Sequence, residues 1–175
     1  MTNRGWYNID YQAGFNLETE LFKDYLPLLK KILNADVVDL VTRGLIDKAA
    51  GTDAIALIEG KVYGISLRFR TSDYDSFTLN RHISDKYSEV HKWKGARSNT
   101  IKPAYFIQVA NTSNHKLKVI RVNIDAFGYY LLHLEKTDQL EQYYKSHLKS
   151  YEFPLQQLSN VTGIWSKEFT LYDIV

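Results

Sequence analysis

Cysteine is absent from this sequence, and proline occurs only 3 times in 175 residues. The lack of cysteine excludes disulfide scaffolds, zinc sites with Cys ligands and thiol nucleophiles, which leaves metal chemistry with oxygen ligands or chemistry without a metal. No apolar run approaches the roughly 18 to 20 residues that cross a bilayer, and the start of the chain lacks the apolar segment of a signal peptide. We therefore expect a cytoplasmic protein without a membrane partner.

Several catalytic signatures are missing as well. The sequence contains no P-loop, no GxGxxG motif and no GxSxG elbow, so it predicts neither a nucleotide cradle nor a serine hydrolase. The 5 histidines never occur as HxH, HxxxH or HExxH. A dedicated histidine metal site is therefore not expected either.

The residues that are present are typical of a globular domain, with 45% hydrophobic and 24% charged positions. A chain of this length usually forms one domain, and no repeat or linker interrupts it. We expect residues 1–175 to form a single α/β domain. Its mixed central sheet is built around a hairpin and flanked by helices.

Hydrophobic periodicity predicts the order of the elements. The first helix is predicted over residues 17–33, with Asn16 as its N-cap and Pro27 as a residue that kinks it or divides it into two short helices. Further helices are predicted over 85–97, 125–133 and 138–149, and strands over 37–42, 53–58, 61–70, 77–80, 104–110, 117–124 and the last nine residues, KEFTLYDIV.

Positive charge is concentrated in the middle of the chain. Residues 61–102 contain nine Lys or Arg and four Asp or Glu, a net charge of +5 where the whole chain carries +2. Clustered Lys and Arg supply most of the sequence-independent affinity for nucleic acid, although a solvated face without a partner is the alternative. The candidate nucleic-acid contacts are Arg70, Arg81, Lys92, Trp93, Lys94 and Arg97. For Trp93, an anchor in the core is the alternative.

The clearest local signal is a hairpin. Two segments of alternating apolar residues, DAIALI and KVYGISLRFR, flank the turn-forming pair EG at 59–60. With these two residues as the turn, Asp53 lies opposite Ser66. Because alternate residues of a strand share a face, Asp53, Ser66, Arg68 and Arg70 are expected on one face of the sheet. The hairpin therefore gathers an acid, a hydroxyl and two guanidinium groups.

The string GTDAIALIEGKVYGISLRFR resembles the core of nucleases of the PD-(D/E)XK superfamily. In these enzymes an Asp begins one strand of such a hairpin, and an acid and a Lys two residues apart follow on the other strand. Asp53 matches the first acid, Ser66 the second acid and Arg68 the lysine. The strings GISLRFR, SFTLNR and KPAYFIQVA also resemble uncharacterised bacterial and phage-borne proteins with a small-x-Arg form of the motif.

The resemblance implies a restriction-endonuclease-like fold and Mg²⁺-dependent hydrolysis of DNA. Superfamily members often carry a Glu on the preceding helix, and Glu18 is the candidate here; charge compensation at a helix N-terminus is its alternative role. The implied Mg²⁺ ligands are Asp53, Glu18 and the carbonyl of Leu67. Because Ser66 supplies no negative charge, cleavage would need another carboxylate, from Glu18 or else from Asp39.

Arg68 keeps the positive charge of the lysine that it replaces, but an arginine stays protonated and cannot act as a base. It suits phosphate binding. A structural ion pair between Asp53 and Arg68, with Ser66 as a hydroxyl neighbour, is the alternative without a function.

Three functions remain open at this stage. The first is a Mg²⁺-dependent DNA endonuclease of restriction, repair or mobile-element type with a degenerate site. The second is a catalytically inactive nucleic-acid-binding module on the same fold. The third is a protein-interaction factor, such as a phage or defence-system inhibitor, that uses its tyrosine-rich surface to bind a protein partner or a second copy of itself.

Overall fold

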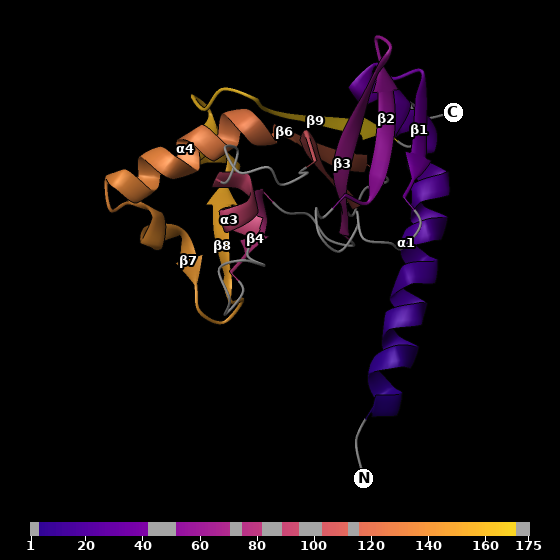
Figure 1. Ribbon diagram of the computed structural model, residues 1–175, viewed down its shortest axis with the longest axis horizontal. Helices are drawn as coiled ribbons and strands as arrows, with labels where there is room; N and C mark the ends of the chain where they lie inside the picture. The colour runs from indigo at the N-terminus through magenta and orange to yellow at the C-terminus, as the bar shows by residue number, and fades with distance from the viewer. Residues whose placement is uncertain are drawn as a thin grey trace.

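The structure is a computed structural model that describes residues 4–41, 52–70, 75–81, 89–94, 103–111 and 116–170. The side chains of residues 4–18, 91 and 92 lie outside this description. The described chain is an α/β fold with a mixed central sheet (Figure 1), which confirms the coarse prediction.

The central sheet contains six described strands in the order β1-β2-β3-β5-β6-β9. Neighbouring strands run antiparallel except β3 and β5, which are parallel. Their bounds are β1 Val37–Leu40, β2 Ala54–Ile58, β3 Lys61–Arg70, β5 Tyr105–Asn111, β6 Lys116–Asn123 and β9 Ile164–Thr170. Each predicted strand from 37–42 to 117–124, apart from 77–80, thus has a counterpart in this sheet. The predicted final strand also exists as the edge strand β9, although it begins earlier and residues 171–175 lie outside the description.

A second sheet was not predicted. The strand expected over 77–80 exists as β4 Ser76–Asn80, but it pairs with β8 Ser150–Pro154, which in turn pairs with the short β7 Tyr144–Lys145. The helix predicted over 138–149 is wrong. Asp138 and Lys149 have φ angles of 56° and 49°, and such left-handed backbone does not continue an α-helix.

The segment between these two residues instead forms a 3₁₀ helix, η2 Leu140–Tyr143, followed by β7. A second 3₁₀ helix, η3 Leu155–Leu158, connects β8 to the loop before β9. The cross-strand partner of Tyr144 is Tyr151, and their rings lie 5.4 Å apart. The helical periodicity of residues 138–149 could not predict this pairing, because Tyr151 lies outside the segment.

The first helix, α1 Arg4–Leu33, is one continuous helix. Asn16 and Pro27 both lie inside it, so the predicted N-cap and the predicted division into two helices are wrong. Pro27 removes one helical hydrogen bond. The next two residues, Leu28 and Leu29, are fully buried among residues of β1, β2, β3, β5, β6 and β9, which stabilises the helix on one face of the sheet.

The opposite face of β5 and β6 is covered by α3 Glu89–Lys94, α4 Ile124–Lys136 and the second sheet. The predicted helix over 125–133 is confirmed by α4, whose N-cap Asn123 accepts a hydrogen bond from the amide of Ala126. The described part of the helix predicted over 85–97 is α3. In the described part of the chain, no helix is long and apolar enough to cross a membrane.

The two helices α3 and α4 approach unusually closely at Gly128. A Cβ atom added to this glycine would lie 2.4 Å from the carbonyl oxygen of Trp93. Gly128→Ala should therefore lower the free energy of unfolding by about 2 kcal/mol, because the backbones must separate. Urea unfolding monitored by circular dichroism measures this. Helix propensity alone would raise stability by about 1 kcal/mol, so a more stable variant would contradict the close contact.

Candidate functional site

The hairpin has the register that the sequence predicted. Ile58 pairs with Lys61 and Ala54 with Ile65, while the amide of Asp53 donates to the carbonyl of Ile65 over 2.8 Å. Glu59 and Gly60 both have positive φ angles, 49° and 73°, as a two-residue hairpin turn requires. Asp53 thus lies opposite Ser66 at the start of β2.

The carboxylate of Asp53 is held by β3. Its Oδ2 atom accepts a hydrogen bond of 2.7 Å from the amide of Leu67 and one of 3.3 Å from the hydroxyl of Ser66. A carboxylate held in this way is a plausible ligand for a hard cation. Leu67 contacts Asp53 through its amide, and the use of the Leu67 carbonyl as a Mg²⁺ ligand stays a prediction.

Arg68 points toward α3 and the second sheet. Its Nη1 atom donates to the carbonyl and hydroxyl oxygens of Thr78 over 2.5 and 3.0 Å, and its Nη2 atom donates to Oε1 of Glu89 over 2.9 Å. The guanidinium also lies over the ring of Phe106, 5.3 Å from its centre. The ion pair with Glu89 is largely sheltered from water, with 18% of the Arg68 side chain and 24% of the Glu89 side chain exposed.

Two arginines converge on one hydroxyl group. Arg70, two residues along β3, donates to the same Thr78 Oγ1 atom over 3.2 Å. Glu89 is the acid that faces Arg68, and its Oε2 atom accepts a hydrogen bond of 2.6 Å from the amide of Asn80. We call Arg68, Arg70, Thr78 and Glu89 the arginine cluster. It carries two positive charges and one negative charge.

A buried glutamine lies beside the cluster. Gln108 of β5 is the register partner of Arg68 and is 1% exposed. Its Nε2 atom donates to the carbonyl of Ser76 over 3.1 Å, whereas its Oε1 atom has no hydrogen-bond partner in the described structure. A buried polar atom without a partner is costly, so it marks a place for a bound water or ligand atom.

Glu89, Thr78 and Gln108 were missed by the sequence analysis. Each belongs to a predicted helix or strand, but nothing in the local pattern indicates that these elements meet at Arg68. The signal that was available is the charge of Glu89, one of four acids in the net basic segment 61–102.

Trp93 is not available as a nucleic-acid contact. Its side chain is 3% exposed and packs against the rings of Phe77, Phe106 and Phe127 at 5.6 to 6.4 Å. The prediction that Trp93 contacts nucleic acid is wrong because α3 uses this indole to bury apolar area, the alternative that the sequence leaves open.

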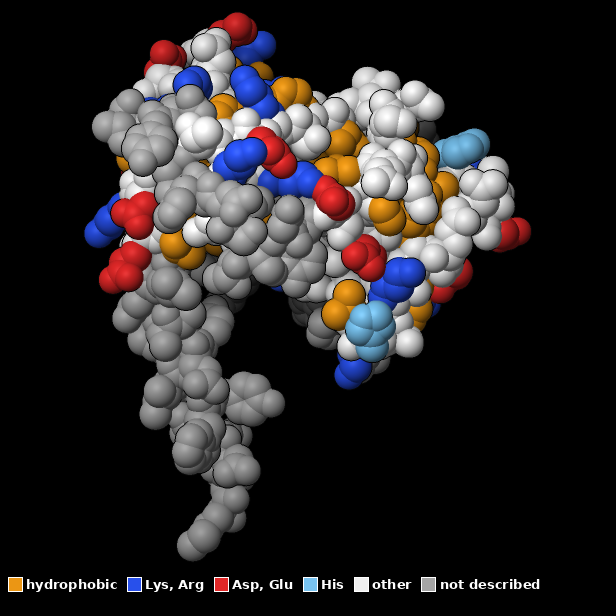
Figure 2. All heavy atoms as spheres, turned by 180° about the vertical axis from the view of Figure 1, so that it is seen from behind, with side chains coloured by type: hydrophobic (Ala, Val, Ile, Leu, Met, Phe, Trp, Pro, Cys, Tyr) orange, Lys and Arg blue, Asp and Glu red, His pale blue; other side chains and the backbone are white. Residues whose placement is uncertain are grey.

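Other predicted basic contacts are engaged within the protein. Arg81 pairs with Glu141 at 3.0 Å and lies over the ring of Tyr144. Lys94 pairs with Glu135 of α4. On the face seen in Figure 2, basic and acidic side chains lie interspersed rather than in one basic patch. The side chains of Lys92 and Glu18 and the whole of Arg97 lie outside the described structure.

A complete metal site is not formed by the described residues, which contain no group of three or more His, Asp or Glu side chains close enough to hold an ion. Asp39, the second candidate for an additional acid, is exposed and accepts the amide of Leu40 over 2.9 Å. The hydrogen bonds described above for Asp53 come from a neutral hydroxyl and a backbone amide. A Mg²⁺ site would therefore need a further carboxylate, for which Glu18 stays the predicted candidate.

Comparisons with known proteins add no family: no family model, no curated protein and no solved structure matches this chain.

The Arg68–Glu89 pair yields a stability prediction. Glu89→Ala removes the acceptor for both Arg68 and the amide of Asn80, so we expect the free energy of unfolding to fall by about 2 kcal/mol, measured by urea unfolding. Glu89→Gln keeps an acceptor and should lose less.

The matched control is Glu168→Ala, which breaks the exposed pair with Lys116, whose charged atoms lie 3.9 Å apart. Exposed pairs contribute under about 1 kcal/mol. Equal losses for Glu89→Ala and Glu168→Ala would contradict a sheltered, structurally important pair at Arg68.

Proposed function

We propose that this protein binds nucleic acid through the phosphate backbone at the arginine cluster and does not cut it. The observation that carries the proposal is the convergence of Arg68 and Arg70 on the hydroxyl of Thr78, at 3.0 and 3.2 Å. Two guanidinium groups beside a hydroxyl match the donors that bind phosphate oxygens in nucleic-acid complexes.

Glu89 acts as an internal substitute for phosphate in this proposal. The Glu89 carboxylate binds the Arg68 guanidinium where a phosphate would bind. A nucleic acid, with its high density of negative charge, competes with Glu89 for this guanidinium. The predicted DNA partner belongs to this proposal. The cluster would recognise the phosphate, which DNA and RNA share, so a preference for DNA must come from contacts outside the cluster.

The composition of the hairpin supports binding without cleavage. Cleavage by two carboxylates and a metal requires negative charge where Ser66 provides a hydroxyl. Arg68 cannot take a proton from the attacking water, and it is already held by Thr78 and Glu89. If the protein binds without cutting, the β2–β3 hairpin and its sheet belong to a restriction-endonuclease-like fold of the PD-(D/E)XK type that has kept phosphate binding.

A second candidate is the Mg²⁺-dependent endonuclease. It is favoured by Asp53, whose carboxylate is oriented by the amide of Leu67 at the start of the hairpin strand. Glu18 of α1, or another carboxylate, would have to supply the second negative charge. In that case Mg²⁺ would polarise the phosphate and activate water, while Arg68 and Arg70 would hold the phosphate oxygens.

Binding is tested by fluorescence anisotropy with labelled DNA at several salt concentrations. Arg70→Ala should weaken binding about tenfold at low salt and reduce the salt slope by about 1, because one phosphate contact is lost. Arg68→Ala should weaken binding at least as much. The control Lys136→Ala removes an exposed charge at the end of α4 and should bind like the unaltered protein.

Cleavage is tested on plasmid DNA with Mg²⁺ or Mn²⁺. Intact plasmid supports the binding module. Metal-dependent cutting that is lost in Asp53→Ala would establish the endonuclease instead. If the protein fails to bind DNA at low salt and captures a protein partner, the interaction factor replaces both readings.

A further inference from the structure

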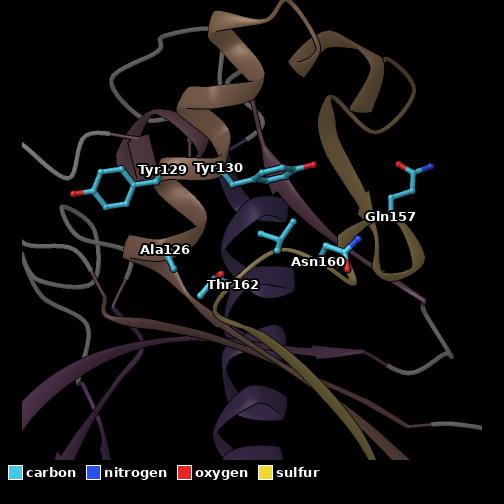
Figure 3. A pocket seen from close by; sticks show the side chains of 7 residues that line it. Ala126, Tyr129, Tyr130, Gln157, Asn160 and Thr162 are labelled. Carbon is cyan, nitrogen blue, oxygen red and sulfur yellow. The ribbon is translucent and has the colours of Figure 1, made fainter.

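A cavity of about 590 Å³ lies between α4 and the loop from η3 to β9, apart from the arginine cluster. Its polar lining comes from Tyr129 and Tyr130 on α4, from Gln157 on η3 and from Asn160 and Thr162 on the loop. Figure 3 shows the ring of Tyr130 extending from α4 toward the loop, whereas Tyr129 points to the other side of the helix. The volume is in the range of small-molecule sites.

The loop that forms one wall is held in place by backbone contacts. Gly163 has a φ angle of 87°, and a Cβ atom at this residue would lie 2.8 Å from the Cβ atom of Ala126. Its carbonyl accepts the amide of Asn123 over 2.8 Å, and the amide of Val161 donates to the carbonyl of Leu158 over 2.9 Å. The cavity is therefore formed before any ligand enters.

The chemistry of the lining selects an uncharged ligand. No charged side chain lines the cavity. The Tyr130 hydroxyl lies 3.3 Å from that of Tyr143, and its ring contacts Phe127 at 5.5 Å. Burial and the hydrogen bond to Tyr143 raise the pKa of Tyr130, which keeps the phenol neutral. An anchored, neutral ring is suited to stacking rather than to ion pairing.

The 3₁₀ helix η3 and the loop after it supply unused hydrogen-bonding groups. In the described structure, the side chains of Gln157, Asn160 and Thr162 take part in no hydrogen bond. Two amides and a hydroxyl therefore present donors and acceptors together beside an aromatic ring. This is the complement of a planar ligand with both donors and acceptors on its edge.

The position of the cavity relates it to the arginine cluster. One row across the sheet joins Ser66, Phe106, Val122 and Ile164 on β3, β5, β6 and β9, and α4 covers this same face. Three strand spacings give about 15 Å through the sheet between Ser66, two residues before Arg68 on β3, and the start of β9, two residues beyond Thr162. A nucleic-acid strand passing over the surface between the two sites would therefore span at least about four nucleotides.

We propose that this cavity is a nucleobase site, in which a base stacks on the ring of Tyr130 and bonds through its edge to the amides of Asn160 and Gln157. The base comes from an unpaired nucleotide of the strand held at the arginine cluster, or from a free nucleoside. The first source depends on the proposed nucleic-acid binding, whereas the second does not.

The test uses the whole protein with two probes: free adenosine, followed by ligand-observed NMR, and a fluorescent single-stranded 15-mer, followed by anisotropy. Asn160→Ala and Gln157→Ala should each weaken binding of the single strand about five- to tenfold, and Tyr130→Leu about tenfold. Adenosine contacts should disappear in the same variants. The matched controls are Gln156→Ala and Ser159→Ala, which alter exposed neighbours that do not line the cavity.

The outcomes separate the two proposals. Adenosine binding that is lost in Asn160→Ala but unchanged in Arg70→Ala supports the cavity by itself, even if DNA binding fails. Binding of the single strand that is unaffected by Asn160→Ala and Gln157→Ala, together with adenosine binding that is absent or equally unaffected, overturns the inference. Losses of the same size in Gln156→Ala, or displacement of adenosine by glucose, also overturn it. Because Asn160 and Gln157 are exposed, their variants test the site even if Tyr130→Leu fails to fold.

Discussion

The packing around Phe77 connects the two sheets, and the position of the arginine cluster depends on it. The ring of this β4 residue is 1% exposed. It lies 5.2 to 6.4 Å from the rings of Phe106 on β5, Phe127 on α4, Phe153 on β8 and Trp93 on α3. A large aromatic side chain in contact with four elements provides much of the apolar burial that holds them together.

This aromatic contact sets the positions of polar neighbours on the same strand. Ser76 and Thr78 flank Phe77, so their side chains point to the opposite side of β4 from its ring. The hydroxyl of Thr78 there meets both arginines. The backbone carbonyl of Ser76 accepts a hydrogen bond from Gln108. The arginine cluster thus lies on the side of β4 opposite the buried ring of Phe77. Helix α3 packs against the same ring through Trp93, and this packing brings Glu89 to Arg68.

Local patterns predicted much of the central sheet because they concern residues close in sequence. Alternation and a two-residue turn predicted the β2–β3 hairpin and its register, and apolar runs predicted β5, β6 and α4. The same methods failed for residues 138–149, where the pairing of Tyr144 with Tyr151 outweighed a helical pattern. They also failed for the start of α1, since Asn16 resembles a cap but lies within the helix.

What the sequence by itself determined is the hairpin: Glu59 and Gly60 set the turn, and the two-residue period then places Asp53 opposite Ser66 on the face of Arg68 and Arg70. Only the tertiary structure decided what that face contacts. The partners of Arg68 are 10 and 21 residues away along the chain, on elements that reach it by burying Phe77 and Trp93. Turn geometry is local, whereas burial depends on every element that shares the core, and for this reason the first could be predicted and the second could not.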